Sequence, residues 1–113
     1  MKQILLDTSF ILTCIKQKID FFEELVGNQI LVPIQVIREL KNLEEDNSKL
    51  SLKLLDKHKF KKIDLELEDV DKGIINFAKE NNKIIIATLD REIKKKTKNP
   101  KIIIRGKKRL EFI

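Results

Sequence analysis

An apolar run that ends in an acidic residue lies in the second half of the chain, Ile84-Ile85-Ile86-Ala87-Thr88-Leu89-Asp90. A shorter run of the same kind lies near the amino end, Ile4-Leu5-Leu6-Asp7. Unbroken aliphatic runs are typical of strands that are buried on both faces of a parallel sheet. Because ligands bind at the carboxyl edge of such sheets, the two runs predict a pair of carboxylates at a ligand-binding edge.

Outward from these runs, segments with strand and helix patterns alternate along the chain. The expected strands cover residues 2–7, 29–32, 60–63, 83–89 and 101–105. The first expected helix begins near residue 10, and the others cover about 20–26, 33–43, 50–57, 68–80 and 91–96. This alternation predicts an α/β fold with a mainly parallel sheet of four to five strands and right-handed crossovers.

Length and composition restrict the class of protein. At 113 residues with 42% hydrophobic content, the chain is expected to form a single compact domain over residues 1–113. The sequence has no cationic leader and no apolar run long enough to cross a bilayer, so we expect a soluble, cytoplasmic protein that does not bind membranes. Cys14 is the only cysteine, which excludes disulfide and thiolate metal sites and predicts a core residue.

The net charge of +6 is unevenly distributed. Between Asp90 and Ile113, ten Lys and Arg residues accompany three Asp and Glu residues, so the basic excess lies in the last quarter of the chain. Such a segment attracts polyanions through phosphate contacts. The alternative is a solvated Lys-rich surface, and charge alone does not separate the two interpretations.

Each acidic residue of interest also has a structural explanation. Asp7 and Asp90 precede helices and are suitable N-caps. Asp71 is a first-turn acid favoured by the helix dipole, and Glu92 is either a surface charge or a spare ligand beside Asp90. Glu39 lies on the expected apolar stripe of its helix, so we expect its carboxylate to point toward the core and to need a cation or strong donors. The alternative is a half-exposed Glu39 paired with a lysine.

Carboxylates brought together repel one another unless protons or a cation neutralise them. An all-oxygen set suits Mg²⁺ or Mn²⁺, which keep several waters and take further ligands from substrate phosphate. The residues therefore indicate a metal-dependent phosphodiesterase, provided that the acids converge.

Four segments in a fixed order cover nearly the whole chain. They are Leu5-Leu6-Asp7-Thr8-Ser9-Phe10-Ile11, Val32-Pro33-Ile34-Gln35-Val36-Ile37-Arg38-Glu39-Leu40, Asp69-Val70-Asp71-Lys72-Gly73-Ile74 through Ala78, and Ala87-Thr88-Leu89-Asp90-Arg91-Glu92-Ile93. In this order they resemble the PIN domain, a family of metal-dependent ribonucleases. The resemblance implies a three-layer α/β/α sandwich.

The resemblance also implies roles for individual residues. Asp7, Glu39, Asp71 and Asp90 match the acidic quartet that binds Mg²⁺ or Mn²⁺ and acts in catalysis. Thr88 matches the threonine of the Thr-x-Asp motif, with Leu89 in place of the common Asn, and Thr8 or Ser9 matches the hydroxyl beside the first acid. Glu92 is a supporting residue. The residues expected to hold the RNA backbone are Lys94, Lys95, Lys96, Lys98, Lys107, Lys108 and Arg109.

The basic carboxyl-terminal segment is most similar to the PIN nucleases of ribosomal RNA processing, and VapC-type toxin endoribonucleases are the nearest alternative. A non-catalytic RNA-binding scaffold with the same fold is a further alternative, and a receiver-like phosphoacceptor ranks lower because the expected acid pair is missing. The expected substrate is single-stranded or structured RNA. A homodimer, an antitoxin partner and a ribosome-assembly partner all stay open.

Overall fold

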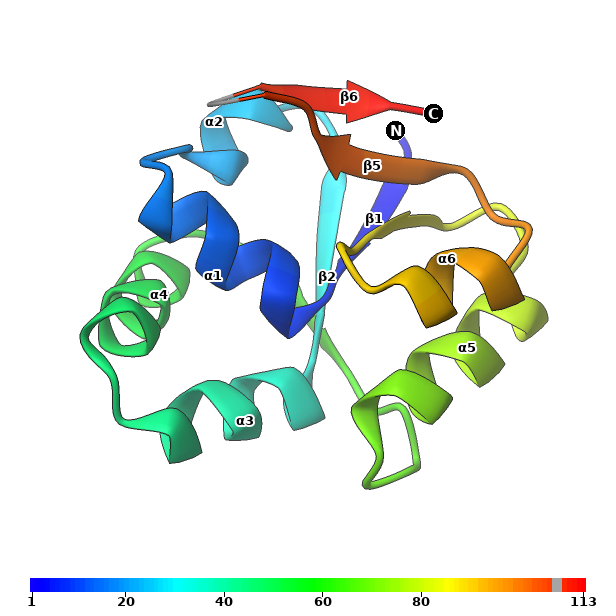
Figure 1. The fold of residues 1–113 in the computed structure, drawn as a ribbon, viewed down its shortest axis with the longest axis horizontal. Helices are drawn as coiled ribbons and strands as arrows, with labels where there is room; N and C mark the ends of the chain where they lie inside the picture. The colour runs from blue at the N-terminus through cyan, green and yellow to red at the C-terminus, as the bar shows by residue number, and fades with distance from the viewer. Residues whose placement is uncertain (107–108) are drawn as a thin grey trace.

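The computed structural model describes residues 1–106 and 109–113, which contain a six-stranded sheet (Figure 1). The strand order is β3-β2-β1-β4-β5-β6. The strands are β1 (Gln3–Leu6), β2 (Gln29–Pro33), β3 (Lys61–Ile63), β4 (Ile85–Ala87), β5 (Lys101–Ile104) and β6 (Leu110–Phe112). Strands β1 to β5 are parallel, and β6 is antiparallel to β5. The predicted α/β fold with a mainly parallel sheet is confirmed.

Strand β1 forms the centre of the sheet. Ile4 pairs with Ile30 of β2 on one side and with Ile85 of β4 on the other. All three side chains are at most 5% exposed, as expected for aliphatic strands covered on both faces. The Asp7 amide continues this pairing by donating to the Ala87 carbonyl at 3.0 Å. The first acid of the sequence therefore leaves the sheet directly beside β4.

Helices cover both faces of the sheet. They are α1 (Thr8–Lys16), α2 (Phe21–Glu24), α3 (Ile34–Leu43), α4 (Asp46–Asp56), α5 (Val70–Glu80) and α6 (Arg91–Lys96). Helices α1, α3 and α4 contact one another, and α5 contacts α6, so they form two groups on opposite sides of the strands (Figure 1). No helix in the described ranges is both long enough and apolar enough to span a membrane.

The strand order reverses direction next to β1. The chain builds β1, β2 and β3 outward on one side, then crosses to form β4, β5 and β6 on the other. Because right-handed crossovers then place their helices on opposite faces, a crevice opens at the carboxyl ends of β1 and β4. This is the topological switch point, and Asp7 and Asp90 follow the two strands that meet there.

The elements differ from the sequence prediction in detail. Strand β6 was not predicted, because three residues at a half-exposed sheet edge carry too little of the alternating pattern to be recognised. Helix α4 begins at Asp46 rather than near Leu50, because Glu45 and Ser48 form a capping box that starts the helix earlier. Cys14 is fully buried, as predicted, and burial raises the pKa of its thiol to about 12.

Helix α5 packs very closely against the segment that follows β3. A Cβ atom added to Gly73 would lie 2.8 Å from Cβ and 3.0 Å from Cδ1 of Leu65. Because the obstructing Leu65 Cβ is held by its own backbone, this side chain cannot swing away. Glycine at position 73 therefore permits the first turn of α5 to lie against Leu65.

We predict that Gly73→Ala destabilises the protein. Overpacking costs about 1–3 kcal/mol, which exceeds the gain of about 1 kcal/mol in helix propensity, so the free energy of unfolding should fall by about 1 kcal/mol. Urea denaturation measures this change. Asn76→Ala, at an exposed position of α5, is the matched control and should be neutral or slightly stabilising. Equal or greater stability of Gly73→Ala would show that the contact is not tight.

Candidate active site

Asp7 is a buried carboxylate at the switch point, with only 4% of its surface exposed. Its Oδ1 accepts a hydrogen bond from the Thr8 amide at 2.7 Å, so it caps α1. Its Oδ2 accepts from the Thr88 hydroxyl at 2.7 Å and from the Ser9 hydroxyl at 3.3 Å. Burial raises the pKa of Asp7, these three hydrogen bonds oppose the rise, and the charge of Glu39 adds to it. The side chain is held firmly by neutral donors and has no cationic partner among the described residues.

Thr88 connects the two acids that end the central strands. Its fully buried hydroxyl donates to Asp7 and accepts from the Asp90 amide at 3.0 Å. Asp90 then caps α6, because its Oδ1 accepts from the Glu92 and Ile93 amides at 2.8 Å and 3.1 Å. Its Oδ2 has no hydrogen-bond partner among the described residues. The predicted supporting residues Thr88 and Ser9 thus contact Asp7 directly.

Glu39 comes from α3, which follows β2, the neighbour of β1 on the side opposite to β4. Its Oε1 accepts a short hydrogen bond from the Thr8 hydroxyl, which places it next to the start of α1. The expectation that this carboxylate points into the core is wrong, because Glu39 is exposed. The core face of α3 is formed by Val36 and Leu40, whereas Leu43 is 39% exposed. No lysine pairs with Glu39 in the part of the chain that the structure describes.

Asp71 lies in the first turn of α5, which follows β3. Partial burial raises its pKa, and the negative charges of Asp90, Asp7, Asp69 and Glu39 raise it further, in that order. Asp71 is therefore close enough to the other three acids of the predicted quartet for their charges to act on it. Asp71 makes no hydrogen bond among the described residues, because the N-cap of α5 is Asp69.

Capping a helix and serving as a ligand are compatible at this site. The helix amides use Oδ1 of Asp90, and the Thr8 hydroxyl uses Oε1 of Glu39, so each residue keeps its second oxygen available. The structural explanation of Asp90 therefore does not exclude a functional one. The oxygen that accepts a hydrogen bond from the protein fixes the direction of the whole carboxylate. Carboxylates that bind metal ions are normally held in this way.

The donor set has the chemistry of a Mg²⁺ or Mn²⁺ site. All candidate donors are carboxylate oxygens, and their charges repel one another without a cation. As the side chains stand, residues 1–106 and 109–113 contain no group of three or more His, Cys, Asp or Glu close enough to hold a metal ion. The residues fit the chemistry of a hard cation with a partial water shell, although they do not form a closed cage.

The predicted basic residues fall into two groups. Lys94, Lys95 and Lys96 lie on α6, which Asp90 caps, with Lys98 just beyond it, while exposed Arg109 lies directly before β6. Figure 1 shows α6 well separated from β6, the strand that Arg109 precedes. Glu92 pairs with Lys96 at 3.1 Å. Lys107 and Lys108 lie outside the described residues.

Sequence reasoning missed Gln35, a buried amide on α3. Its Nε2 donates to Asp64 at 2.7 Å, and its Oε1 accepts from the Leu65 amide at 3.1 Å. The available signal was a polar residue inside the apolar segment Ile34-Gln35-Val36, directly after Pro33. A polar side chain there must find partners, because unpaired buried amides are costly.

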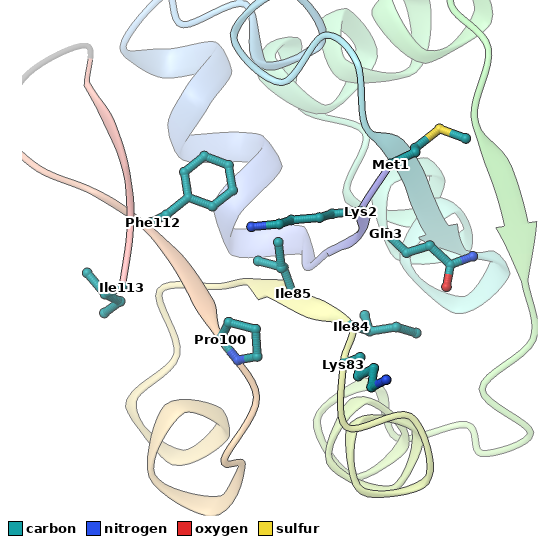
Figure 2. A pocket seen from close by; sticks show the side chains of 9 residues that line it. All are labelled: Met1, Lys2, Gln3, Lys83, Ile84, Ile85, Pro100, Phe112 and Ile113. Atoms are coloured by element: carbon teal, nitrogen blue, oxygen red, sulfur yellow. The ribbon is translucent and has the colours of Figure 1, made fainter.

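A hollow lies at the amino ends of β1 and β4, at the edge of the sheet opposite to the acids. Its volume is about 560 Å³, and Figure 2 shows its lining. The lining residues are Met1, Lys2, Gln3, Lys83, Ile84, Ile85, Pro100, Phe112 and Ile113. They come from the amino ends of β1 and β4 and from the end of β6. Because none of them belongs to the acidic cluster of Asp7, Glu39, Asp71 and Asp90, this hollow is separate from the candidate active site.

The strand order and the acids at its switch point place the chain in the class of doubly wound α/β domains. Within this class, the family model of the PIN-like domain matches residues 4–107, and the chain belongs to that family. Ribonuclease VapC4 of Methanocaldococcus jannaschii is 29% identical over an alignment of 127 positions, which covers 99% of this chain and 97% of the relative. The structure of the PIN domain endonuclease Utp24 matches with a TM-score of 0.85 at 21% identity and covers 97% of this chain and 90% of that one. The second likeness shows a shared fold.

We predict that Asp7→Asn stabilises the protein at neutral pH. The native pKa of Asp7 is raised above its ordinary value of 3.8, so its contribution to stability is complete below that value and is lost as the pH rises through the native pKa. The substitution removes this loss. Urea denaturation between acidic and neutral pH should show a stability gain that is greatest at neutral pH and fades below the native pKa.

The same substitution at Asp20 is the matched control. Asp20 is an exposed N-cap of α2 and lies outside the acidic cluster. We expect Asp20→Asn to give no comparable pH-dependent gain. A loss of stability in Asp7→Asn at neutral pH would show that the hydrogen bonds to Asp7 outweigh the cost of burying its charge.

Proposed function

We propose that the protein is a metal-dependent ribonuclease that hydrolyses phosphodiester bonds in RNA. The observation that carries this proposal is the set of hydrogen bonds through Thr8 and Thr88 that joins Glu39, Asp7 and Asp90 at the switch point. The charges of these three acids also raise the pKa of Asp71. Membership of the PIN-like family supports the proposal, as does the likeness to a relative named as a ribonuclease.

Asp7, Glu39 and Asp90 would hold Mg²⁺ or Mn²⁺ directly or through water, and Asp71 would complete the site or hold a second ion. A divalent ion at such a site neutralises phosphate charge and lowers the pKa of a bound water. The chain's own part is to fix the oxygens. Thr88 and the Thr8 amide orient Asp7, while the Thr8 hydroxyl orients Glu39.

The remaining part of the proposal concerns the substrate. The lysines of α6 follow Asp90 within two helical turns, so they are suited to hold phosphates of an RNA whose backbone crosses the acidic cluster. Phosphate contacts of this kind give affinity without selecting bases. With six Phe and no Trp or Tyr in the chain, base stacking is a poor source of sequence specificity. RNA shape or a partner protein would then select the target.

The cellular role has two candidates that share this chemistry. Processing of ribosomal RNA with a ribosome-assembly partner is one, and a VapC-type toxin held by an antitoxin is the other. The named relative VapC4 favours the second. A cytoplasmic location and a homodimer are consistent with either role and belong to the proposal.

We predict that the wild-type protein cleaves a fluorescently labelled single-stranded RNA in Mn²⁺ or Mg²⁺ and that EDTA abolishes the cleavage. Loss of an outer-shell partner of a metal site typically costs 10- to 100-fold in activity, so loss of a direct ligand in Asp7→Asn or Asp90→Asn should cost about 100-fold or more. Gel analysis of product formation measures the rates.

Asp20→Asn serves again as the control and should retain full activity, because Asp20 caps α2 outside the acidic cluster. Binding of RNA without cleavage in either metal would support the non-catalytic scaffold instead. Cleavage that persists in both Asp7→Asn and Asp90→Asn would exclude this cluster as the active site.

We predict that Lys94→Ala/Lys95→Ala weakens RNA binding in a salt-dependent way. In the non-cleaving Asp7→Asn background, the slope of log affinity against log salt should decrease in magnitude by about 0.7 for each lysine that contacts a phosphate. Fluorescence anisotropy over a salt series measures the slope.

The matched control removes two exposed lysines at the opposite edge of the sheet, Lys2→Ala/Lys83→Ala (Figure 2). Both double variants lower the net charge equally, so only a local contact gives different slopes. Equal slopes in the two variants would show that α6 attracts RNA through net charge alone.

A further inference from the structure

The buried amide of Gln35 connects α3 to the segment that leads into α5. Both ends of the amide contact this segment: Nε2 donates to Asp64 Oδ1 at 2.7 Å, and Oε1 accepts from the Leu65 amide at 3.1 Å. The same Asp64 oxygen accepts from the Glu66 amide at 2.8 Å, which closes the turn. Gln35 is 7% exposed, so these hydrogen bonds are largely protected from water. Only a side chain with a donor and an acceptor at this length makes both contacts.

The turn that Gln35 holds packs directly against α5. Leu65 lies against Gly73, where an added Cβ would approach it to 2.8 Å. Gly73 is two residues beyond Asp71, and Gln35 is one helical turn before Glu39 on α3. The contacts therefore form a continuous connection from the helix that carries one acid to the helix that carries another.

This connection bridges two helices that the fold places in different layers. Helix α3 contacts α1 and α4, whereas α5 contacts α6 on the other side of the sheet (Figure 1). An ion pair between Arg38 and Glu68 at 3.3 Å also joins α3 to the segment before α5, and its side chains are 53% and 91% exposed. Exposed pairs of this kind contribute little. The buried amide is therefore the stronger of these two links.

We propose that Gln35 is a positioning residue that holds Asp71 of α5 in range of Glu39 and so sets the affinity of the acidic cluster for a divalent cation. This inference rests on the proposed function. Two carboxylates that share a cation repel each other in its absence, so an element outside the cluster must hold them together. The clamp formed by Gln35, Asp64, Leu65 and Gly73 supplies that force without entering the cluster.

The test compares Mn²⁺ binding by isothermal titration calorimetry in the wild-type protein and three variants. Gln35→Met keeps the length of the side chain and removes both hydrogen bonds. Gln35→Glu/Asp64→Asn keeps the net charge and restores both contacts of residue 35 with the donor on residue 64, but it gives up the bond from the Glu66 amide, because the new side-chain nitrogen at position 64 takes the place of the shared oxygen. Asn99→Leu is the matched control, because this buried amide also makes two hydrogen bonds, to the carbonyls of Asn81 and Ile84, at the opposite edge of the sheet.

We expect Gln35→Met to weaken Mn²⁺ binding by about tenfold, as for other residues that orient metal ligands. The double variant should restore part of the affinity, because the contact between residues 35 and 64 returns while the Glu66 amide loses its acceptor. Asn99→Leu should lower the melting temperature and leave Mn²⁺ affinity unchanged. A second readout needs no metal: hydrogen exchange of the Gly73 amide, which donates to Asp69 in the first turn of α5, should accelerate only in Gln35→Met.

Unchanged Mn²⁺ affinity in Gln35→Met, or an equal loss in Asn99→Leu, would overturn the positioning role. Absence of Mn²⁺ binding in the wild-type protein would instead overturn the proposed function. In that case unchanged Gly73 exchange in Gln35→Met would overturn the clamp as well, whereas faster exchange would support it. If Gln35→Met does not fold, the single variant Gln35→Glu replaces it, because it keeps the acceptor for the Leu65 amide and loses the donor to Asp64.

Discussion

The hydrogen bond between the Thr88 hydroxyl and the buried Asp7 carboxylate is the interaction on which the site depends. It joins the carboxyl ends of β1 and β4, the two strands that meet at the switch point, and its length is 2.7 Å. Thr88 also accepts from the Asp90 amide, so one side chain fixes two acids at once. A neutral donor can hold a carboxylate in place without cancelling its charge. The charge that remains is what a cation would bind.

Much of this edge could be predicted from the sequence. Apolar runs that end at Asp7 and Asp90 indicate strands whose carboxyl ends carry acids, and the alternation of elements indicates a parallel sheet. The adjacency of β1 and β4 was not in the sequence pattern, because strand order is set by crossovers between distant segments. Asp71 could be singled out only by family resemblance, since a first-turn acid is ordinary in a helix.

The wrong prediction for Glu39 and the missed residue Gln35 both have physical causes. Periodicity placed Glu39 on a core stripe between Val36 and Leu43, yet Leu43 is 39% exposed and the buried apolar residues on this part of α3 are Val36 and Leu40. The Glu39 carboxylate instead accepts from the Thr8 hydroxyl at the start of α1. Gln35, one turn earlier, is the residue that is actually buried and polar. Periodicity reports the direction of a side chain but not how far the covering layer extends.

The acids differ in what holds them, and this difference explains why the elements around them matter. Asp7, Asp90 and Glu39 each have an oxygen fixed by a neutral donor. The donors are the Thr8 amide for Asp7, the Glu92 amide for Asp90 and the Thr8 hydroxyl for Glu39. Asp71 has none among the described residues, and it is also the acid whose pKa is raised by all the others. Repulsion therefore acts most freely on the side chain with the fewest local restraints. The position of Asp71 must then be set by the backbone of α5, and so by the packing of Gly73 on Leu65 and by the buried amide that anchors that turn to α3.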